Sequence, residues 1–126
     1  MSTDRAARFY IENGYWLHKK PLFTDEKFAQ LCTLFEEILA DQDKGRRADQ
    51  LDLPHFRYPA LFEFLLADQV LDLVEPFIGP NIGLWSSHFI CREPQIGRAT
   101  PWHEDSAYWN GRLDRMDQII TVWLAI

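Results

Sequence analysis

The chain has 126 residues, a formal net charge of −6 and 47% hydrophobic residues, which suits one domain, or part of one, with an apolar core. The negative charge argues against a nucleic-acid partner, because phosphate binding requires clustered Lys and Arg. No stretch approaches the roughly 20 apolar residues of a membrane span. Residues 1–10 lack the features of a signal or transit peptide, so we expect a cytoplasmic protein without a nucleic-acid or membrane partner.

The first part of the chain is predicted to be mainly helical. A short helix over residues 3–12 is followed by the stop signal Gly14 and by a short strand that ends at Pro21. Thr24 is placed to cap a second helix, in which apolar side chains recur every three or four residues. These apolar positions are Phe28, Leu31, Cys32, Phe35, Ile38 and Leu39.

Residues 41–58 are predicted to form a loop, because they are charged, aperiodic and interrupted by Gly and Pro. Helical spacing returns over residues 60–78 and predicts two short helices with a hinge near Asp68. The sequence Gly-Pro-Asn at 79–81 ends them. Helices therefore account for most of the first 80 residues.

The rest of the chain is predicted to form strands. Residues 82–94 are rich in β-branched and aromatic residues, and residues 100–105 form a second short strand. Residues 117–126 form a third, whose nearly continuous apolar run implies burial on both faces or a covered edge. Helices followed by strands indicate an α+β fold. A chain that stops in such a strand would leave an exposed sheet edge, so we expect the front part of a longer domain; a C-terminal strand inside the sheet is the alternative.

The two cysteines, Cys32 and Cys91, lack the short spacing of a metal-binding or redox-active pair. We expect free thiols, as in a protein from a reducing compartment. A disulfide between them is the alternative.

Candidate chemistry lies in the sequence Pro-Trp-His-Glu-Asp-Ser-Ala-Tyr-Trp at 101–109. Side chains alternate along a strand, so His103 and Asp105 share one face and Glu104 points to the other. An imidazole and a carboxylate on one face can bind the same metal ion, as in the facial triad of non-haem Fe(II) oxygenases, which needs one more His. A simple hydrogen-bonded His–Asp pair without a metal is the alternative.

Two other kinds of catalytic site do not fit the sequence. A zincin helix requires H-E-x-x-H, but Ala107 stands where the second His would be. A nucleophile elbow requires G-x-S-x-G, which the chain lacks. Of the other histidines, we expect His18 to be solvated and His55 to be a surface or capping residue. His88 is expected on a strand, on the same face as Arg92.

Three blocks of the sequence are LDLVEPFIGPNIGLWSSHFICREP at 71–94, TPWHEDSAYW at 100–109 and ITVWLAI at 120–126. Together they resemble the phytanoyl-CoA dioxygenase family of Fe(II)/2-oxoglutarate oxygenases. In order, they resemble the family's helix-to-strand entry, its W-H-x-D metal strand and its V-W-x-A-[LI] strand. Residues 9–38 also resemble the family's opening Gly-Tyr strand and long helix, so the resemblance covers almost the whole chain.

The resemblance implies a fold and a set of metal ligands. The fold would be α+β, with helices of residues 1–80 packed as a buttress on a jelly roll, also called a double-stranded β-helix. Residues 81–126 would supply only the first strands of this single domain. His103 and Asp105 would bind Fe(II). The family's distal His and the Arg that binds 2-oxoglutarate would lie beyond Ile126.

Four further roles follow from the resemblance. Arg92 stands where many members have a Lys that contacts 2-oxoglutarate, and the change leaves its role open because the two side chains bind carboxylates differently. Trp123 matches a tryptophan beside the co-substrate. Tyr108 and Trp109 match aromatic residues near which substrate approaches. An ordinary place in the core is the alternative for each of these aromatic residues.

The implied activity is a dioxygenase reaction that uses O₂ and 2-oxoglutarate to hydroxylate a small organic substrate. Asp105 favours hydroxylation, because halogenating relatives have a small residue there and leave the position open for chloride. A metal-free jelly-roll binding module, or a truncated chain that is inactive by itself, is the alternative. The sequence does not identify the substrate, and residues 41–58 and 106–114 are the segments expected to select it.

Overall fold

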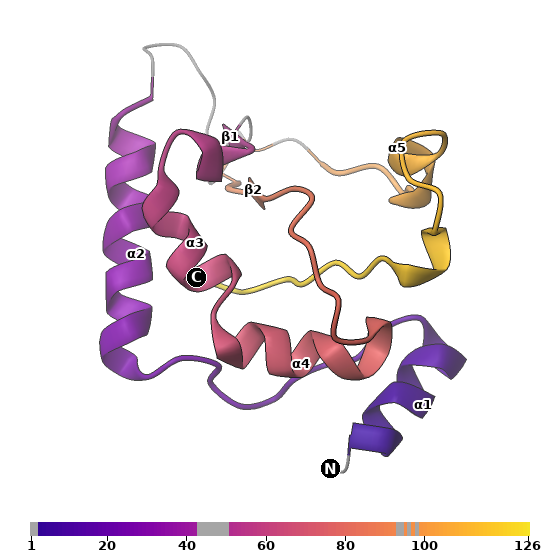
Figure 1. The fold of residues 1–126 in the computed structure, drawn as a ribbon. Helices are drawn as coiled ribbons and strands as arrows, with labels where there is room; N and C mark the ends of the chain where they lie inside the picture. Colours follow the sequence, from indigo (N-terminus) through magenta and orange to yellow (C-terminus); the bar gives the residue numbers. More distant parts are fainter. Residues whose placement is uncertain (1–2, 43–50, 93–94, 96, 98) are drawn as a thin grey trace.

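The computed structural model describes residues 3–42, 51–92, 95, 97 and 99–126 (Figure 1). These residues combine several helices with a small sheet, which is compatible with the predicted α+β class. In chain order the elements are α1 (Thr3–Asn13), α2 (Asp25–Ala40), β1 (Leu51–Asp52), η2 (Pro54–Phe56), η3 (Pro59–Leu61), α3 (Phe62–Leu65), α4 (Asp68–Ile78), β2 (His88–Phe89), α5 (Ser106–Trp109) and η4 (Met116–Gln118).

The helices predicted from local sequence signals are confirmed. α1 ends at Asn13, just before Gly14, whose φ of 77° is in the left-handed region that glycine adopts without strain. The Thr24 side chain caps α2 by accepting a hydrogen bond from the backbone N–H of Lys27 at 3.3 Å. α3 and α4 are separate helices, as predicted, and α4 begins at Asp68. The N–H of Gly79 then closes α4 on the Glu75 carbonyl at 2.8 Å.

The core lies between α2 and the segment from β1 to α3 (Figure 1). Leu31 and Ile38, which are seven residues apart and so lie on one face of α2, are both buried there, and Ile38 is fully enclosed at 0% exposure. The buried residues of this cluster are Phe23, Leu31, Ile38, Leu51, Leu61, Phe64 and Ala67. Separately, α1 packs on α4 through the rings of Tyr10 and Phe77, whose centroids are 5.0 Å apart.

The sheet of the described residues joins two distant segments. β1 and β2 are antiparallel, with Leu51 opposite Phe89 and Asp52 opposite His88. The Phe89 ring lies 4.9 Å from the ring of Phe35, which places the sheet beside α2. The prediction of a loop over residues 41–58 is therefore wrong for β1 and η2, while residues 43–50 lie outside the described part.

Most of the predicted strands are not formed. Residues 14–21, 100–105 and 117–126 contain no strand, and the strand predicted over 82–94, of which 93–94 lie outside the described part, is limited to β2. A strand requires a neighbouring backbone to pair with, whereas composition and alternation report only the surroundings of side chains. The jelly roll therefore remains a prediction.

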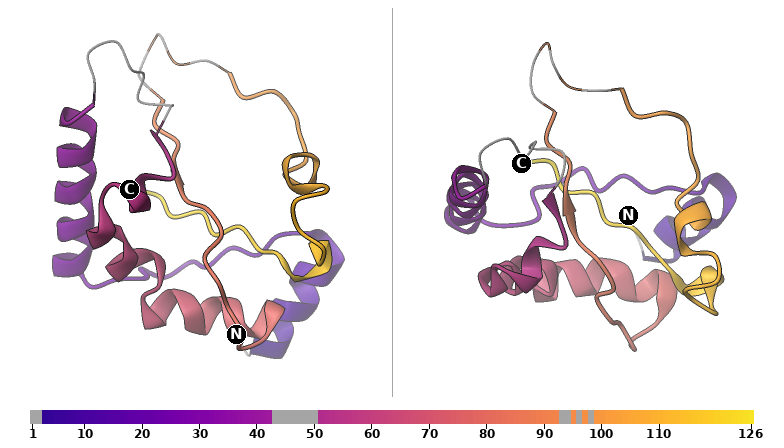
Figure 2. Two further views of the ribbon diagram at one scale, coloured as in Figure 1. Left: turned by 45° about the horizontal axis from the view of Figure 1, so that its top comes forward. Right: turned by 90° about the horizontal axis from the view of Figure 1, so that it is seen from above.

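The C-terminal segment, residues 119–126, crosses the molecule from the α5 end back towards α2 (Figure 2). Its side chains are open to solvent from Thr121 onward, with Trp123 73% exposed. The prediction that this apolar run is buried on both faces or forms a covered edge is wrong for the described residues, because no adjacent strand covers it.

Two general predictions can also be compared with the structure. Cys32 and Cys91 are free thiols, as expected. Within the described ranges, every helix is too short or too polar to cross a membrane.

Candidate metal centre

The two predicted metal ligands lie at the start of α5. Residues 101–104 form neither helix nor strand, and Asp105 already has helical dihedral angles of φ −58° and ψ −32°. The Asp105 carbonyl accepts a hydrogen bond from the N–H of Tyr108 at 2.9 Å, which closes the first turn. The Asp105 carboxylate then lies beside the imidazole of His103, with Oδ1 3.4 Å from Nε2. The structure thus brings these two side chains together, although the segment is not a strand.

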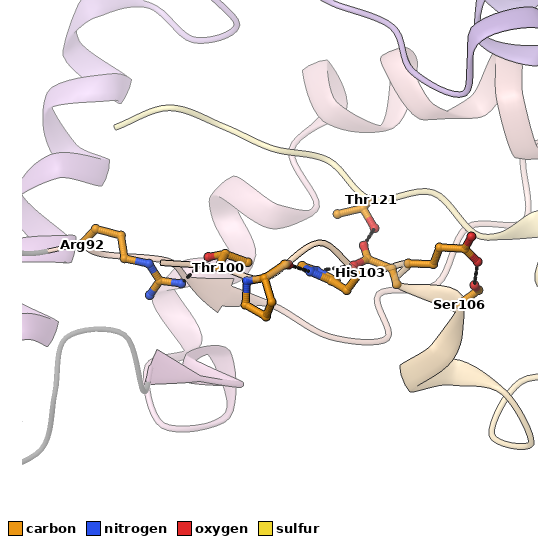
Figure 3. Close-up of polar contacts among 8 residues, drawn as sticks. Arg92, Thr100, His103, Ser106 and Thr121 are labelled. Carbon is orange, nitrogen blue, oxygen red and sulfur yellow. Dashed lines mark hydrogen bonds and ion pairs between the residues drawn. The ribbon is translucent and has the colours of Figure 1, made fainter. Parts of the chain in front are cut away.

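The imidazole of His103 is held in one orientation by the backbone. Its Nδ1 lies 2.8 Å from the carbonyl oxygen of Pro101 (Figure 3). Because a carbonyl oxygen can only accept, Nδ1 must carry the proton that it donates. In the neutral imidazole, Nε2 is then the nitrogen with the free lone pair. Metal-bound histidines usually have this arrangement, in which the other ring N–H donates to a carbonyl or carboxylate.

The two oxygens of Asp105 have different surroundings. Oδ1 faces His103, whereas Oδ2 accepts a hydrogen bond from the Thr121 hydroxyl at 3.3 Å (Figure 3). The neighbouring acid, Glu104, instead accepts a hydrogen bond from the Ser106 hydroxyl at 3.3 Å. Sequence reasoning missed Thr121; the available signal was that it is the one polar residue in the run 119–126.

The facing atoms of His103 and Asp105 fit a shared divalent cation. Nε2 with a free lone pair and a carboxylate Oδ1 are both acceptors, so either a proton or a metal ion between them would stabilise their approach. Adjacent ligands of an octahedral ion with bonds of about 2.1 Å lie about 3 Å apart, close to the observed 3.4 Å. Imidazole with carboxylate also suits Fe(II).

The pair is open to incoming groups. The side chains of His103 and Asp105 are 36% and 43% exposed. Among the described residues, no third His, Cys, Asp or Glu joins them in a cluster able to hold a metal ion. The geometry thus brings together two candidate ligands that are accessible to incoming groups.

A second His–Asp pair provides an internal comparison. His88 Nδ1 lies 2.9 Å from Asp52 Oδ1, across the β1–β2 ladder. A carboxylate oxygen accepts, so Nδ1 carries the proton and the contact is an ordinary hydrogen bond. This pair is complete with a neutral imidazole, whereas a neutral His103 with its proton on Nδ1 leaves Nε2 without a proton to donate to Asp105.

The aromatic residues predicted near the substrate have different surroundings. The Tyr108 ring meets the His103 ring edge to face, with centroids 5.7 Å apart. Trp109 instead contacts Trp85, at 6.2 Å between ring centroids. Tyr108 is 59% exposed, so it can contact a molecule that approaches His103. The structure therefore brings Tyr108, but not Trp109, into contact with a predicted ligand.

The residues predicted to bind the co-substrate lie on two different segments. Arg92 follows β2 and donates a hydrogen bond from Nη2 to Thr100 Oγ1 at 2.9 Å. Thr100 begins the segment that leads to His103, and Figure 3 shows Arg92 beside Thr100, with His103 farther along the segment. Trp123 is exposed on the C-terminal segment. Neither Arg92 nor Trp123 has a contact with the His103 side chain among those found in the described residues.

His55 departs from its predicted surface position. It is 2% exposed, its Nδ1 lies 2.6 Å from Ser87 Oγ, and its ring contacts those of Phe56 and Phe62. The prediction was wrong because the Ser87 hydroxyl, 32 residues away, satisfies a polar ring atom in the interior. His18 is half-buried rather than solvated, since its ring contacts Trp16 at 5.5 Å.

Comparison with known proteins identifies the family. A family model described as phytanoyl-CoA dioxygenase matches residues 10–126. The chain belongs to the phytanoyl-CoA dioxygenase family. This confirms the family inferred from the three sequence blocks, of which the second contains His103 and Asp105.

A curated family relative is the mouse (Mus musculus) protein named "Phytanoyl-CoA dioxygenase, peroxisomal". It is 28% identical over an alignment 146 positions long, which covers 98% of this chain and 42% of the relative. The chain therefore spans less than half the length of that relative. No solved structure matches the chain significantly. The name of the mouse protein refers to the peroxisome, and the cytoplasmic location predicted for this family member stays untested.

Proposed function

We propose that this family member is a non-haem Fe(II)/2-oxoglutarate-dependent dioxygenase that hydroxylates a small organic substrate. The observation that carries the proposal is the approach of His103 Nε2 to Asp105 Oδ1, at 3.4 Å, with His103 Nδ1 bonded to a backbone carbonyl. Membership of the phytanoyl-CoA dioxygenase family supports the reaction class. Iron, when bound with 2-oxoglutarate, would supply the activation of O₂.

His103 and Asp105 would have complementary roles as ligands. His103 provides a neutral nitrogen whose direction is set by the Pro101 carbonyl. Asp105 provides one negative charge, which partly balances a divalent ion. A carboxylate at this position also occupies a site that chloride would need, which favours hydroxylation over halogenation. The third ligand would come from a residue outside the described part of the chain.

Arg92 and Trp123 are proposed to contact 2-oxoglutarate. A guanidinium can bind a carboxylate through two parallel hydrogen bonds, and the Arg92–Thr100 contact anchors this side chain on the segment that leads to the ligands. Tyr108 and Trp109 are proposed to contact the substrate. The position of Tyr108 against His103 supports this assignment, because a molecule held on its exposed ring would lie close to the metal. We also propose that the complete domain is a jelly roll.

The proposal can be tested on the protein expressed from its complete reading frame. Anaerobic addition of Fe(II) and 2-oxoglutarate should produce a weak visible absorption band, and admission of O₂ should convert 2-oxoglutarate to succinate. Asp105→Asn should abolish both signals, because it removes the anionic ligand. Asp52→Asn is the matched control, since Asp52 belongs to the other His–Asp pair, and should retain both.

A folded wild-type protein that shows neither the band nor succinate would contradict the proposal. That result would favour a metal-free binding module. If Asp105→Asn and Asp52→Asn lose the absorption band and succinate formation equally, the placement of the metal centre is contradicted.

A further inference from the structure

We propose that Thr121 is a positioning residue for the metal site, whose hydroxyl holds the Asp105 carboxylate so that a single oxygen faces the metal. The Thr121 hydroxyl donates to Oδ2 at 3.3 Å, while Oδ1 faces His103 (Figure 3). This role rests on the proposed function, because it concerns the same metal ion. It adds a residue from the C-terminal segment to a site otherwise built from residues 101–105.

The Asp105 carboxylate needs an external partner to be oriented. Its terminal torsion is soft, and a carboxylate can bind a cation through one oxygen or both. The side chain makes no capping hydrogen bond to the backbone of α5. His103, in contrast, is fixed by a carbonyl only two residues away. Hydrogen bonding of Oδ2 by Thr121 favours binding through Oδ1 alone.

Thr121 is suited to this role by its place in the chain. It lies 16 residues after Asp105, and the adjacent side chains of Ile120 and Val122 have no hydrogen-bond donor. No backbone hydrogen bond is found between residues 101–105 and 119–126, all of which are described. The hydroxyl–carboxylate contact therefore couples the position of the C-terminal segment to that of a metal ligand.

The contact is expected to affect metal binding more than folding. At 3.3 Å it is longer than the roughly 2.7–2.8 Å typical of hydroxyl hydrogen bonds. Thr121 is also exposed, so its substitution creates no buried cavity. In contrast, loss of a partner that orients a metal ligand typically weakens metal affinity by about 10–100-fold.

Three substitutions separate the hydroxyl from the rest of the side chain. Thr121→Val keeps the shape and loses the hydroxyl, Thr121→Ala loses both, and Thr121→Ser keeps the hydroxyl. Mn(II) affinity of the protein expressed from its complete reading frame is measured from the electron paramagnetic resonance signal of free Mn(II). Val and Ala should weaken binding by about 10–100-fold, and Ser should restore most of the affinity.

Thr33→Val is the matched control. Thr33 lies on the exposed face of α2, where its hydroxyl donates to the Ala29 carbonyl at 3.0 Å. This variant should bind Mn(II) as the wild type does. Thermal unfolding without metal should be nearly the same for the wild type and the three Thr121 variants, which would exclude a general loss of structure.

Each other outcome contradicts the role of Thr121. Wild-type affinity in Thr121→Val would show that the hydroxyl is dispensable, and a Ser variant as weak as Val would show that the hydroxyl is insufficient. Metal-free unfolding of the Val and Ala variants well below the wild-type temperature would show a structural role instead. Absence of Mn(II) binding by the wild type would overturn the proposed metal centre itself, whereas binding that Val leaves unchanged would overturn only the positioning role.

Discussion

Two regions of the molecule position their side chains by different means. In the helical part, the described residues of 3–78, a cluster of apolar side chains is enclosed in a core. In the C-terminal part, residues 99–126, no described residue is buried, and Trp102 and Trp123 are 104% and 73% exposed. The candidate metal ligands lie in the C-terminal part and are oriented by a carbonyl and a hydroxyl. Packing therefore determines the helices, while a few polar contacts determine the site.

This comparison separates effects on stability from effects on metal binding. Substitutions in the helical part should lower the free energy of unfolding and leave the candidate ligands in place. Substitutions in the C-terminal part should change metal binding with little effect on unfolding. The expected effects below run from the largest to the smallest.

The largest loss of stability is expected for Ile38→Ala. Ile38 is fully enclosed, and truncation of such a residue costs about 2–5 kcal/mol because it leaves a cavity. Trp123→Ala, which removes a larger but exposed side chain, should change the free energy of unfolding by less than about 0.5 kcal/mol. Urea unfolding monitored by circular dichroism measures both. A loss for Trp123→Ala that equals the loss for Ile38→Ala would remove the distinction between the regions.

His55→Ala should lower the free energy of unfolding by an intermediate amount. It leaves the Ser87 hydroxyl without its 2.6 Å partner in a part-buried place, which costs about 1–3 kcal/mol in addition to any loss of packing. His88→Ala is the control, because its pair with Asp52 is exposed and such pairs contribute about 0–1 kcal/mol. Urea unfolding again compares the two variants. Equal effects would mean that the burial of His55 does not contribute to stability.

The smallest effect is expected for Glu26, at the start of α2, whose contribution to stability should depend on pH. Hydrogen bonding by its own backbone N–H, and then by the Thr24 hydroxyl, lowers the pKa of the Glu26 carboxyl from 4.5. The ionised form is therefore favoured in the folded state, so its contribution to stability is present above the unfolded pKa and is lost as pH falls through the lowered folded pKa.

Glu26→Gln removes this titration, so its deficit in the free energy of unfolding should be present at neutral pH and disappear in acid. Urea titrations of the wild type and the variant, from neutral pH down into acid, measure this difference in the free energy of unfolding. A difference that stays constant with pH would show that the carboxylate has no such effect.

The sequence predicted features that depend on neighbouring residues. Gly14 and Thr24 set helix ends through local backbone conformation and capping, so both could be recognised. The approach of His103 to Asp105 could be expected because the two are only two residues apart.

Features that depend on the path of the chain could not be predicted in this way. The pairing of β1 with β2 joins residues more than thirty positions apart, and the partner of His55 is 32 residues away. The Thr121 hydroxyl reaches Asp105 across 16 residues, so its role is visible only in the structure. The same limitation explains why most of the predicted strands are not formed, because an apolar sequence does not show which segment it pairs with.

The most direct test of the account is the Mn(II) affinity of His103→Ala compared with that of His88→Ala. Both variants remove an imidazole that lies beside a carboxylate, but only His103 directs a free nitrogen lone pair to its partner. We expect His103→Ala to lose affinity by more than the roughly 10–100-fold typical for loss of an outer partner, and His88→Ala to bind as the wild type does. Unchanged affinity in His103→Ala, or an equal loss in His88→Ala, would contradict a metal centre at His103 and Asp105.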